Sequence, residues 1–226
     1  MNFEIHIGES LDWLKSQKPN NQFVIVTDPP YGIGESNKKA LAREKMAKPI
    51  DYGDFDWDKK RLTQPYFENM LRISNHQVIF GGIYYTDFLP VSSSWIVWDK
   101  QNGTNDFADC EMAWTSHKKA VRIFRYLWNG MIKAKPEQRF HPTQKPLELM
   151  RWVIRNYTNP EDIVIDPFAG SGTTLVACVL EGRSCIGVEM QERYKKVIEQ
   201  RVSDAMSKKG LAAKTVNESM LLESMF

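Results

Sequence analysis

Short apolar runs alternate with amphipathic stretches along most of the 226-residue chain, and this alternation limits the possible folds more than any other feature. The apolar runs are rich in β-branched and aromatic residues, as the buried strands of a parallel sheet are. They cover residues 3–7, 23–26, 78–80, 95–98, 163–165 and 184–188. We therefore expect a sheet whose strands are joined by helical connections.

Four further stretches have apolar residues at helical spacing. One has Pro65 in its first turn, the second begins at Pro146, the third covers residues 173–181, and the fourth runs from 191 to about 206. Strands that alternate with helices predict a doubly wound, mostly parallel α/β sheet.

Three segments do not follow this alternation. Residues 32–61 are long and polar, which predicts a mobile loop. Residues 110–115 and 121–127 are strand-like and close in sequence, so we expect them to form a hairpin. The chain otherwise reads as one domain over residues 1–207, followed by a C-terminal tail over residues 208–226.

The sequence Thr-Asp-Pro-Pro-Tyr, at residues 27–31, ends the second apolar run. Two prolines stop a strand and fix the backbone, because each locks φ and lacks an N–H. The Asp28 carboxylate and the Pro29 carbonyl are then rigid acceptors for the two protons of a planar amino group. Tyr31 supplies an aromatic face for a base. The alternative interpretation is an ordinary turn that only ends the strand.

A glycine-rich turn, Asp-Pro-Phe-Ala-Gly-Ser-Gly-Thr at residues 166–173, joins a predicted strand to a predicted helix. It lacks both the lysine of a phosphate-binding loop and the third glycine of the dinucleotide-binding pattern. Free N–H groups at a helix N-terminus suit a carboxylate. An amino-acid group therefore fits this turn better than a pyrophosphate.

Acidic residues follow four of the predicted strands. Glu189 lies about twenty residues after the glycine-rich turn, where a doubly wound fold places the carboxylate that binds ribose hydroxyls. If the chain is circularly permuted, its first strand completes the sheet. The strand ends then line up as Asp166, Glu189, Glu9 and Asp28, with three carboxylates for a nucleoside-like cofactor and one for a substrate amine.

The 30 basic and 28 acidic residues nearly balance, but the positive charges are clustered. Such clusters suit phosphate binding, although each one alone is equally compatible with a solvated face. They comprise Lys38, Lys39, Arg43, Lys45, Lys48, Lys59, Lys60, Arg61, Lys118, Lys119, Arg122, Arg125, Lys133, Lys135 and Arg139.

Several classes of protein and site are disfavoured. The three cysteines show no CxxC spacing, which suits buried thiols in a reducing compartment. The four histidines are scattered, so we expect no metal. No apolar run approaches the ~18 residues that span a bilayer, and the N-terminus does not resemble a signal peptide. A cytoplasmic location is therefore expected.

The order of these motifs resembles that of the β-order N6-adenine/N4-cytosine DNA methyltransferases, in which Asp-Pro-Pro-Tyr precedes the cofactor motif. The resemblance covers roughly residues 3–202 and includes Phe-x-Gly-x-Gly at 168–172 and His-Pro-Thr-Gln-Lys-Pro at 141–146. Trp98-Asp99-Lys100 and Glu111 also match. It implies a Rossmann-like, S-adenosylmethionine-dependent methyltransferase fold, circularly permuted, with a seven-stranded sheet and an antiparallel hairpin strand.

The resemblance also implies the residues of the site, with S-adenosylmethionine as the cofactor and no metal. The implied catalytic residues are Asp28, Pro29, Pro30 and Tyr31. The implied cofactor-binding residues are Glu9, Ser10, Asp28, His141, Thr143, Lys145, Asp166, Phe168, Ala169, Gly170, Ser171, Gly172, Thr173 and Glu189.

The chain departs from the family in two places. Gly8-Glu9 stands where the family usually has Gly-Asp, which implies a longer or water-mediated contact to the cofactor adenine. Residues 116–139 leave room only for a reduced target-recognition region. The implied activity is methylation of adenine N6 in double-stranded DNA after base flipping, and a homodimer is a further expectation.

Three alternatives stay open at this point. N4-cytosine methyltransferases often have serine where this chain has Asp28, a tendency with exceptions. Amino-methyltransferases that act on RNA or on protein glutamine use a related turn, but they generally carry the glycine-rich motif first. The non-enzymatic alternative is a catalytically silent nucleic-acid-binding subunit, against which both intact motifs argue.

Overall fold

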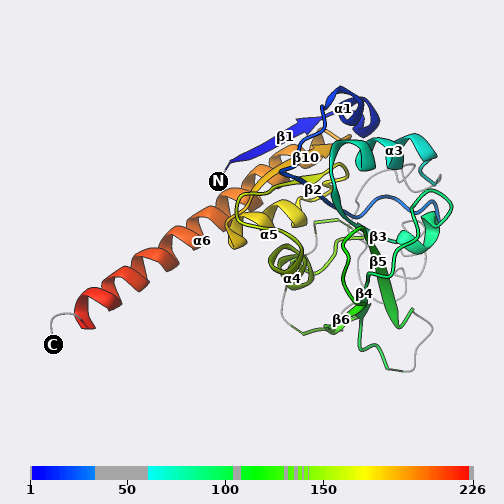
Figure 1. Cartoon of the computed structure of the whole chain (residues 1–226). Coiled ribbons are helices and arrows are strands. Elements are labelled where there is room, and N and C mark those ends of the chain that lie inside the picture. The colour runs from blue at the N-terminus through cyan, green and yellow to red at the C-terminus, as the bar shows by residue number, and fades with distance from the viewer. Residues whose placement is uncertain are drawn as a thin grey trace.

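An eight-stranded sheet forms the centre of the part of the chain that the structure describes (Figure 1). The computed structural model describes residues 2–33, 61–103, 108–129, 132–134, 137–138, 140–141 and 143–223. The neighbouring strands are, in order, β1 (Phe3–Ile7), β10 (Ser184–Glu189), β9 (Ile163–Asp166), β2 (Phe23–Thr27), β3 (His76–Phe80), β5 (Cys110–Thr115), β4 (Trp95–Asp99) and β6 (Arg122–Arg125).

The pairing of these strands confirms a mostly parallel, circularly permuted sheet. From β1 to β3 all neighbours are parallel, and the first strand of the chain, β1, lies beside the last, β10. β5 is antiparallel to both of its neighbours, whereas β6 is parallel to β4. The antiparallel strand that the sequence predicted is therefore present.

The predicted hairpin between residues 110–115 and 121–127 is wrong, and the described sheet has eight strands rather than seven. β5 forms its hairpin with the preceding strand, β4, and inserts between β4 and β3. Ala113, Trp114 and Thr115 of β5 are buried, so this strand belongs in the interior of the sheet. β6 has mostly exposed side chains and adds the eighth strand at the edge.

Helices cover both faces of the sheet. One face packs against α4 (Leu147–Tyr157), α5 (Thr173–Glu181) and α6 (Arg193–Glu223), and the other against α1 (Ser10–Ser16) and α3 (Gln64–Ile73). Successive side chains of a strand point to opposite faces, so β2, which is buried throughout, contributes to both cores. This arrangement is the doubly wound architecture that the sequence predicted.

Two helices differ from the prediction. α1 was not predicted, because seven residues show too little of the helical period. α6 was predicted to end near residue 206, but it continues to Glu223. Ala205 is the last α6 residue in the core among the described side chains, and the helix beyond it projects away from the sheet (Figure 1). The predicted tail over residues 208–226 therefore begins inside this helix.

The predicted target-recognition region, residues 116–139, contains β6 and a separate two-stranded sheet. This small sheet pairs β7 (Trp128–Asn129) with β8 (Ile132–Lys133) in antiparallel fashion. Among the described residues, no helix combines the length and the apolar character that a transmembrane segment requires.

The loop predicted over residues 32–61 lies outside the described residues except at its two ends. At its C-terminal end, the Arg61 guanidinium pairs with Asp87 and lies 4.5 Å from the centre of the Phe88 ring. Arg61 was one of the basic residues predicted to bind phosphate, and in the structure it already has partners within the domain.

Candidate functional site

Four parallel strands carry acidic residues to one edge of the sheet. The strand order places Glu9 after β1, Glu189 at the end of β10, Asp166 at the end of β9, and Asp28 after β2. The four carboxyl groups share an edge as predicted. Their predicted order is wrong, however, because β2 pairs with β9 and so brings Asp28 beside Asp166 rather than beside Glu9.

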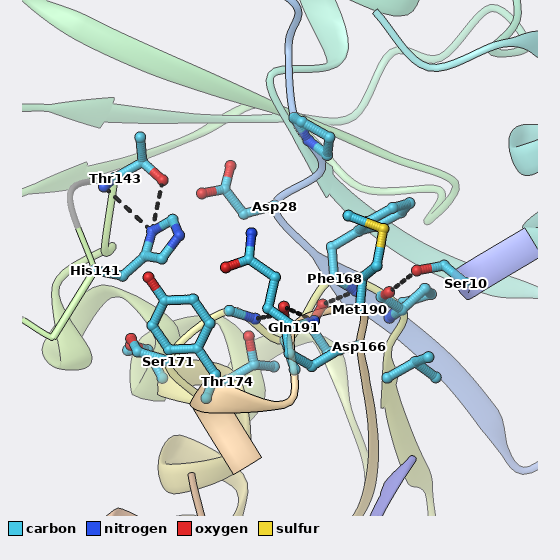
Figure 2. A pocket seen from close by; sticks show the side chains of 18 of the residues that line it. Ser10, Asp28, His141, Thr143, Asp166, Phe168, Ser171, Thr174, Met190 and Gln191 are labelled. Atoms are coloured by element: carbon cyan, nitrogen blue, oxygen red, sulfur yellow. Dashed lines mark hydrogen bonds between the residues drawn. The ribbon is translucent and has the colours of Figure 1, made fainter. Parts of the chain in front are cut away.

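A cavity of about 270 Å³ opens at this edge (Figure 2). Of the residues predicted for the cofactor, only Gly172 does not line it. Of those predicted for catalysis, Asp28 and Pro30 line it, whereas Pro29 and Tyr31 do not. The residues that both line the cavity and were predicted are Glu9, Ser10, Asp28, Pro30, His141, Thr143, Lys145, Asp166, Phe168, Ala169, Gly170, Ser171, Thr173 and Glu189.

The two glycines of the turn have left-handed backbones but different surroundings. Gly170, at φ +53, lines the cavity, and a Cβ atom there would meet no atom within 4 Å. Gly172, at φ +81, is the N-cap of α5, and a Cβ atom there would lie 3.1 Å from the Ile198 side chain. Gly170 thus leaves its space to the cavity, whereas Gly172 allows α6 to pack closely.

The Glu189 carboxylate joins the glycine-rich turn to the segment after β10. Its two oxygens accept hydrogen bonds from the Gly170 N–H and the Gln191 N–H, each at 2.8 Å. Burial raises the pKa of this carboxyl, and the two N–H donors oppose that effect. Each carboxylate oxygen has a second lone pair, so Glu189 can bind the backbone and still accept from a ribose hydroxyl.

Asp166 is more deeply placed, with only 2% of the residue exposed. Its Oδ1 atom accepts from the Thr27 hydroxyl at 2.7 Å and from the Phe168 N–H at 3.1 Å. Burial raises the pKa of Asp166 to about 6. These contacts tie β9 to β2 and shape the start of the glycine-rich turn.

At the end of β1, two side chains connect the cavity wall to neighbouring elements. Glu9 caps α1 by accepting from the Leu11 N–H at 3.1 Å, and it accepts from the Tyr66 hydroxyl of α3 at 2.6 Å. The Ser10 hydroxyl donates to the Pro167 carbonyl at 2.5 Å. The longer glutamate, found where the family usually has aspartate, is therefore anchored by a tyrosine of α3.

The acceptor end of the cavity is formed by the turn after β2. The Lys145 ammonium lies 2.7 Å from Asp28 and 3.0 Å from Glu111. Burial raises the pKa of Asp28, and Lys145 opposes that rise. Burial alone would lower the pKa of Lys145, but the two carboxylates raise it, so this lysine is a cation.

Tyr31, the last residue of this turn, is held in place through both its hydroxyl and its ring. Its hydroxyl donates to Asp28 at 2.5 Å, and its ring stacks on Tyr84 with centroids 4.9 Å apart. Tyr84 belongs to η2 (Gly82–Tyr85), a short helix after β3. Gly81, at φ +64, lets the Tyr31 ring approach the backbone, because a Cβ atom there would overlap the ring. The Tyr85 hydroxyl donates to the Pro30 carbonyl and so also fixes the turn.

His141 lies beside Thr143, on the side of the cavity away from Ser10 (Figure 2). Burial, with the nearby Arg193 and Lys145 cations, lowers its pKa to about 4. The neutral ring has Nδ1 at 3.1 Å from the Thr143 hydroxyl, and it packs 5.2 Å from the Tyr194 ring. This histidine is therefore an uncharged part of the cavity wall.

Several lining residues were not predicted. Met190 and Gln191 directly follow Glu189, and the Gln191 side chain extends into the cavity (Figure 2). Their position next to a predicted ligand was the only signal for them in the sequence. The other lining residues that were missed are Leu62, Tyr66, Met150, Pro167, Thr174, Val188 and Tyr194.

The cavity fits an adenosyl group that carries an amino-acid arm. Gly170 leaves space for a ligand beside a helix N-terminus, and the Glu189 carboxylate, which accepts from the Gly170 N–H at 2.8 Å, adjoins that space. Phe168, Tyr66 and Met190 supply apolar surface for a purine ring. Among the described side chains, no group of three or more histidine, cysteine, aspartate or glutamate residues is arranged to hold a metal.

Comparison with known proteins finds DNA methyltransferases among the relatives of the chain. The DNA methylase family of N6/N4 methyltransferases matches residues 98–200. Type II methyltransferase M2.LlaDCHI of Lactococcus lactis subsp. cremoris is 37% identical over an alignment of 237 positions, and the alignment covers 87% of each chain.

Two solved structures agree with the fold. The M1.HpyAVI–SAM complex is 28% identical, with a TM-score of 0.58, and the match covers 88% of this chain and 98% of that one. The cytosine-N4-specific PvuII DNA methyltransferase is 18% identical, with a TM-score of 0.54, and the match covers 92% of each chain. At that identity the second likeness concerns the fold alone.

Proposed function

The chain belongs to the N6-adenine/N4-cytosine DNA methyltransferase family, and on that premise we propose that it methylates adenine N6 in double-stranded DNA. The enzymes of this family use S-adenosylmethionine. The observation that supports the proposal most directly is that Asp28 and the glycine-rich turn line one cavity. A methyl donor and an amine acceptor can therefore be held next to each other.

S-adenosylmethionine, when bound, supplies the methyl group: a bond forms from the target nitrogen to the methyl carbon, and the C–S bond breaks with its electron pair left on sulfur. The residues of the chain position the amine for this attack. Asp28 and the Pro29 carbonyl accept hydrogen bonds from its two N–H groups, which aims the nitrogen lone pair at the methyl group. The negative charge of Asp28 stabilises the positive charge that develops on nitrogen, which afterwards loses a proton to water.

The target base must leave the duplex, because the cavity edge cannot reach an amino group inside the stack. Tyr31 and Tyr84 already form an aromatic pair beside Asp28, and a flipped base can stack at this position. We propose double-stranded DNA as the substrate and a homodimer as the working form. Light scattering of the purified protein measures its mass in solution and so tests whether it is a dimer.

Cytosine N4 is the second candidate target, because the family to which the chain belongs includes enzymes that methylate either amino group. Asp28 favours adenine, since the cytosine enzymes often have serine at that position. The choice therefore depends on the acceptor turn and not on the fold.

Mass spectrometry of nucleosides identifies the target. The protein is incubated with S-adenosylmethionine and mixed-sequence duplex DNA, which is then digested. We expect N6-methyldeoxyadenosine. N4-methyldeoxycytidine as the only product would establish the second candidate, and methylation of RNA or protein but not DNA would contradict both.

A further inference from the structure

Four charged side chains from four separate segments meet at the acceptor end of the cavity. Lys145 lies between Asp28, at 2.7 Å, and Glu111 of β5, at 3.0 Å. Glu111 also pairs at 2.6 Å with Lys100, just beyond the end of β4. Only 8% of the Lys145 side chain is exposed, so its charge is stabilised by these partners rather than by water.

We propose that Lys145, held by Glu111, is a positioning residue that keeps the Asp28 carboxylate ionised and oriented to accept a hydrogen bond from the target amine. This inference rests on the proposed function, because it requires an amino group as the substrate. Sequence resemblance implied that Lys145 contacts the cofactor. Lys145 does line the cavity, but its ammonium contacts the acceptor carboxylate and the Tyr31 hydroxyl.

Ionisation matters because an ionised carboxylate only accepts hydrogen bonds, whereas a protonated one also donates. Burial favours the protonated form of Asp28, and Lys145 is the group that opposes burial most strongly. The other groups that act on Asp28 are the Tyr31 hydroxyl, which donates to it, and the carboxyls of Glu111 and Asp166. Without the ammonium, Asp28 would face two carboxyl groups and would take up a proton more readily.

Glu111 has a distinct part in this arrangement. Asp28, Lys145, Glu111 and Lys100 together carry no net charge when all four are ionised. Burial alone would raise the pKa of Glu111, but Lys145 and Lys100 lower it to about 2, so it remains ionised. By pairing with Lys145, Glu111 limits how far that cation offsets the Asp28 charge, which suits an amine that becomes positive during methylation. With Glu111 uncharged, Lys145 would cancel the charge of Asp28.

The pH dependence of single-turnover methyl transfer, at saturating S-adenosylmethionine, tests the proposal. The rate should fall on the acid side of the pH–rate profile as Asp28 takes up a proton. In Lys145→Met this acid limb should move to higher pH by about 1–3 units, the range over which a nearby opposite charge shifts a carboxyl pKa. In Glu111→Gln the limb should move to lower pH, and in the double variant it should fall between the two. Arg151→Met is the matched control, because it breaks a 2.6 Å ion pair with Glu181 that does not line the cavity.

An acid limb of Lys145→Met that coincides with wild type would overturn the inference. A weakened affinity for S-adenosylmethionine with an unchanged pH profile would also overturn it, since Lys145 would then be a cofactor contact. If thermal unfolding shows that Lys145→Met does not fold, Glu111→Gln decides: a shift to lower pH supports the inference, and no shift overturns it.

Different results would disprove the proposed function and this inference. The proposed function fails if the wild-type protein binds S-adenosylmethionine and yields no N6-methyldeoxyadenosine. If wild type yields that product and the variants keep its pH profile, only the role of Lys145 is wrong.

Discussion

The two ends of the cavity are held together in different ways. The cofactor end consists of the glycine-rich turn and Glu189, which lie 19 residues apart and are joined through backbone N–H groups. The acceptor end consists of Asp28, Tyr31 and Lys145, and its central ion pair joins residues 117 apart. The cofactor end is thus a local, backbone-built structure, whereas the acceptor end depends on buried side-chain charges that only the complete fold assembles.

This difference predicts that the two ends can be damaged independently. Changes at the cofactor end should weaken binding of S-adenosylmethionine, and changes at the acceptor end should slow methyl transfer to bound DNA. The predictions below go from the largest expected effect to the smallest.

Asp28→Ala should slow methyl transfer by about 10²–10³-fold, by analogy with the loss of one hydrogen-bonding group that stabilises a transition state. The fold should persist, because Asp28 follows β2 and lies outside the hydrophobic cores. The Kd for S-adenosylmethionine should change far less than the rate. Steady-state transfer of labelled methyl groups measures the rate, and a variant with more than a tenth of wild-type kcat would remove Asp28 from the mechanism.

Gly170→Val should raise the Kd for S-adenosylmethionine by about tenfold to a hundredfold, because added methyl groups in a packed contact cost about 1–3 kcal/mol. Gly172→Val is the matched control. Both positions have a left-handed backbone, but a side chain at Gly172 would meet Ile198 rather than the cavity. Calorimetric titration should therefore show weaker binding for the first variant, and thermal unfolding should show lost stability for the second. Equal affinities in the two variants would contradict the placement of the ligand at Gly170.

The third prediction is smaller and concerns how His141 makes the stability of the fold depend on pH. The pKa of this histidine, about 4 in the folded chain, lies below the ordinary 6.5, so the unfolded chain binds more protons between these values. The stability that the neutral ring contributes is therefore complete above pH 6.5 and is lost as the pH falls toward 4. Asp166, with its pKa raised to about 6, acts in the opposite direction over the range from 3.8 to 6.

Comparing the stability of variants separates the contribution of His141 from that of the other titratable groups. Urea unfolding of His141→Asn should show a smaller loss of stability between pH 7 and pH 5 than wild type shows. His6→Asn is the control for loss of a histidine, because His6 is exposed and lies outside the cavity. A His141→Asn variant that loses as much stability as wild type on acidification would mean that the ring is not held neutral.

The difference between the locally built cofactor end and the acceptor end, which only the complete fold assembles, also explains which features the sequence predicted. The glycine-rich turn and the Glu189 carboxylate were predictable, because their spacing is local and their geometry follows from glycine and a strand end. α5 was predicted with its correct bounds, since Gly182 ends it with a left-handed cap. The Asp28 turn was predicted for a similar reason, because two prolines fix it.

Features that depend on tertiary packing were not predictable in this way. The position of β5 between β3 and β4 depends on buried contacts and not on the nearest strand in sequence. The contact of Lys145 with Asp28 joins segments that only the folded sheet brings together. Tyr66 reaches Glu9 from α3, 57 residues away, and no local pattern indicates such a contact.

The central claim, that the two ends do separate tasks, is tested most directly by single-turnover methyl transfer at saturating S-adenosylmethionine. Glu189→Ala removes the acceptor of the Gly170 and Gln191 N–H groups, so it should bind the cofactor more weakly. Once saturated, it should nevertheless transfer the methyl group at close to the wild-type rate, whereas Asp28→Ala should remain about 10²–10³-fold slower. A saturated Glu189→Ala variant as slow as Asp28→Ala, or an Asp28→Ala variant restored by excess cofactor, would contradict the claim.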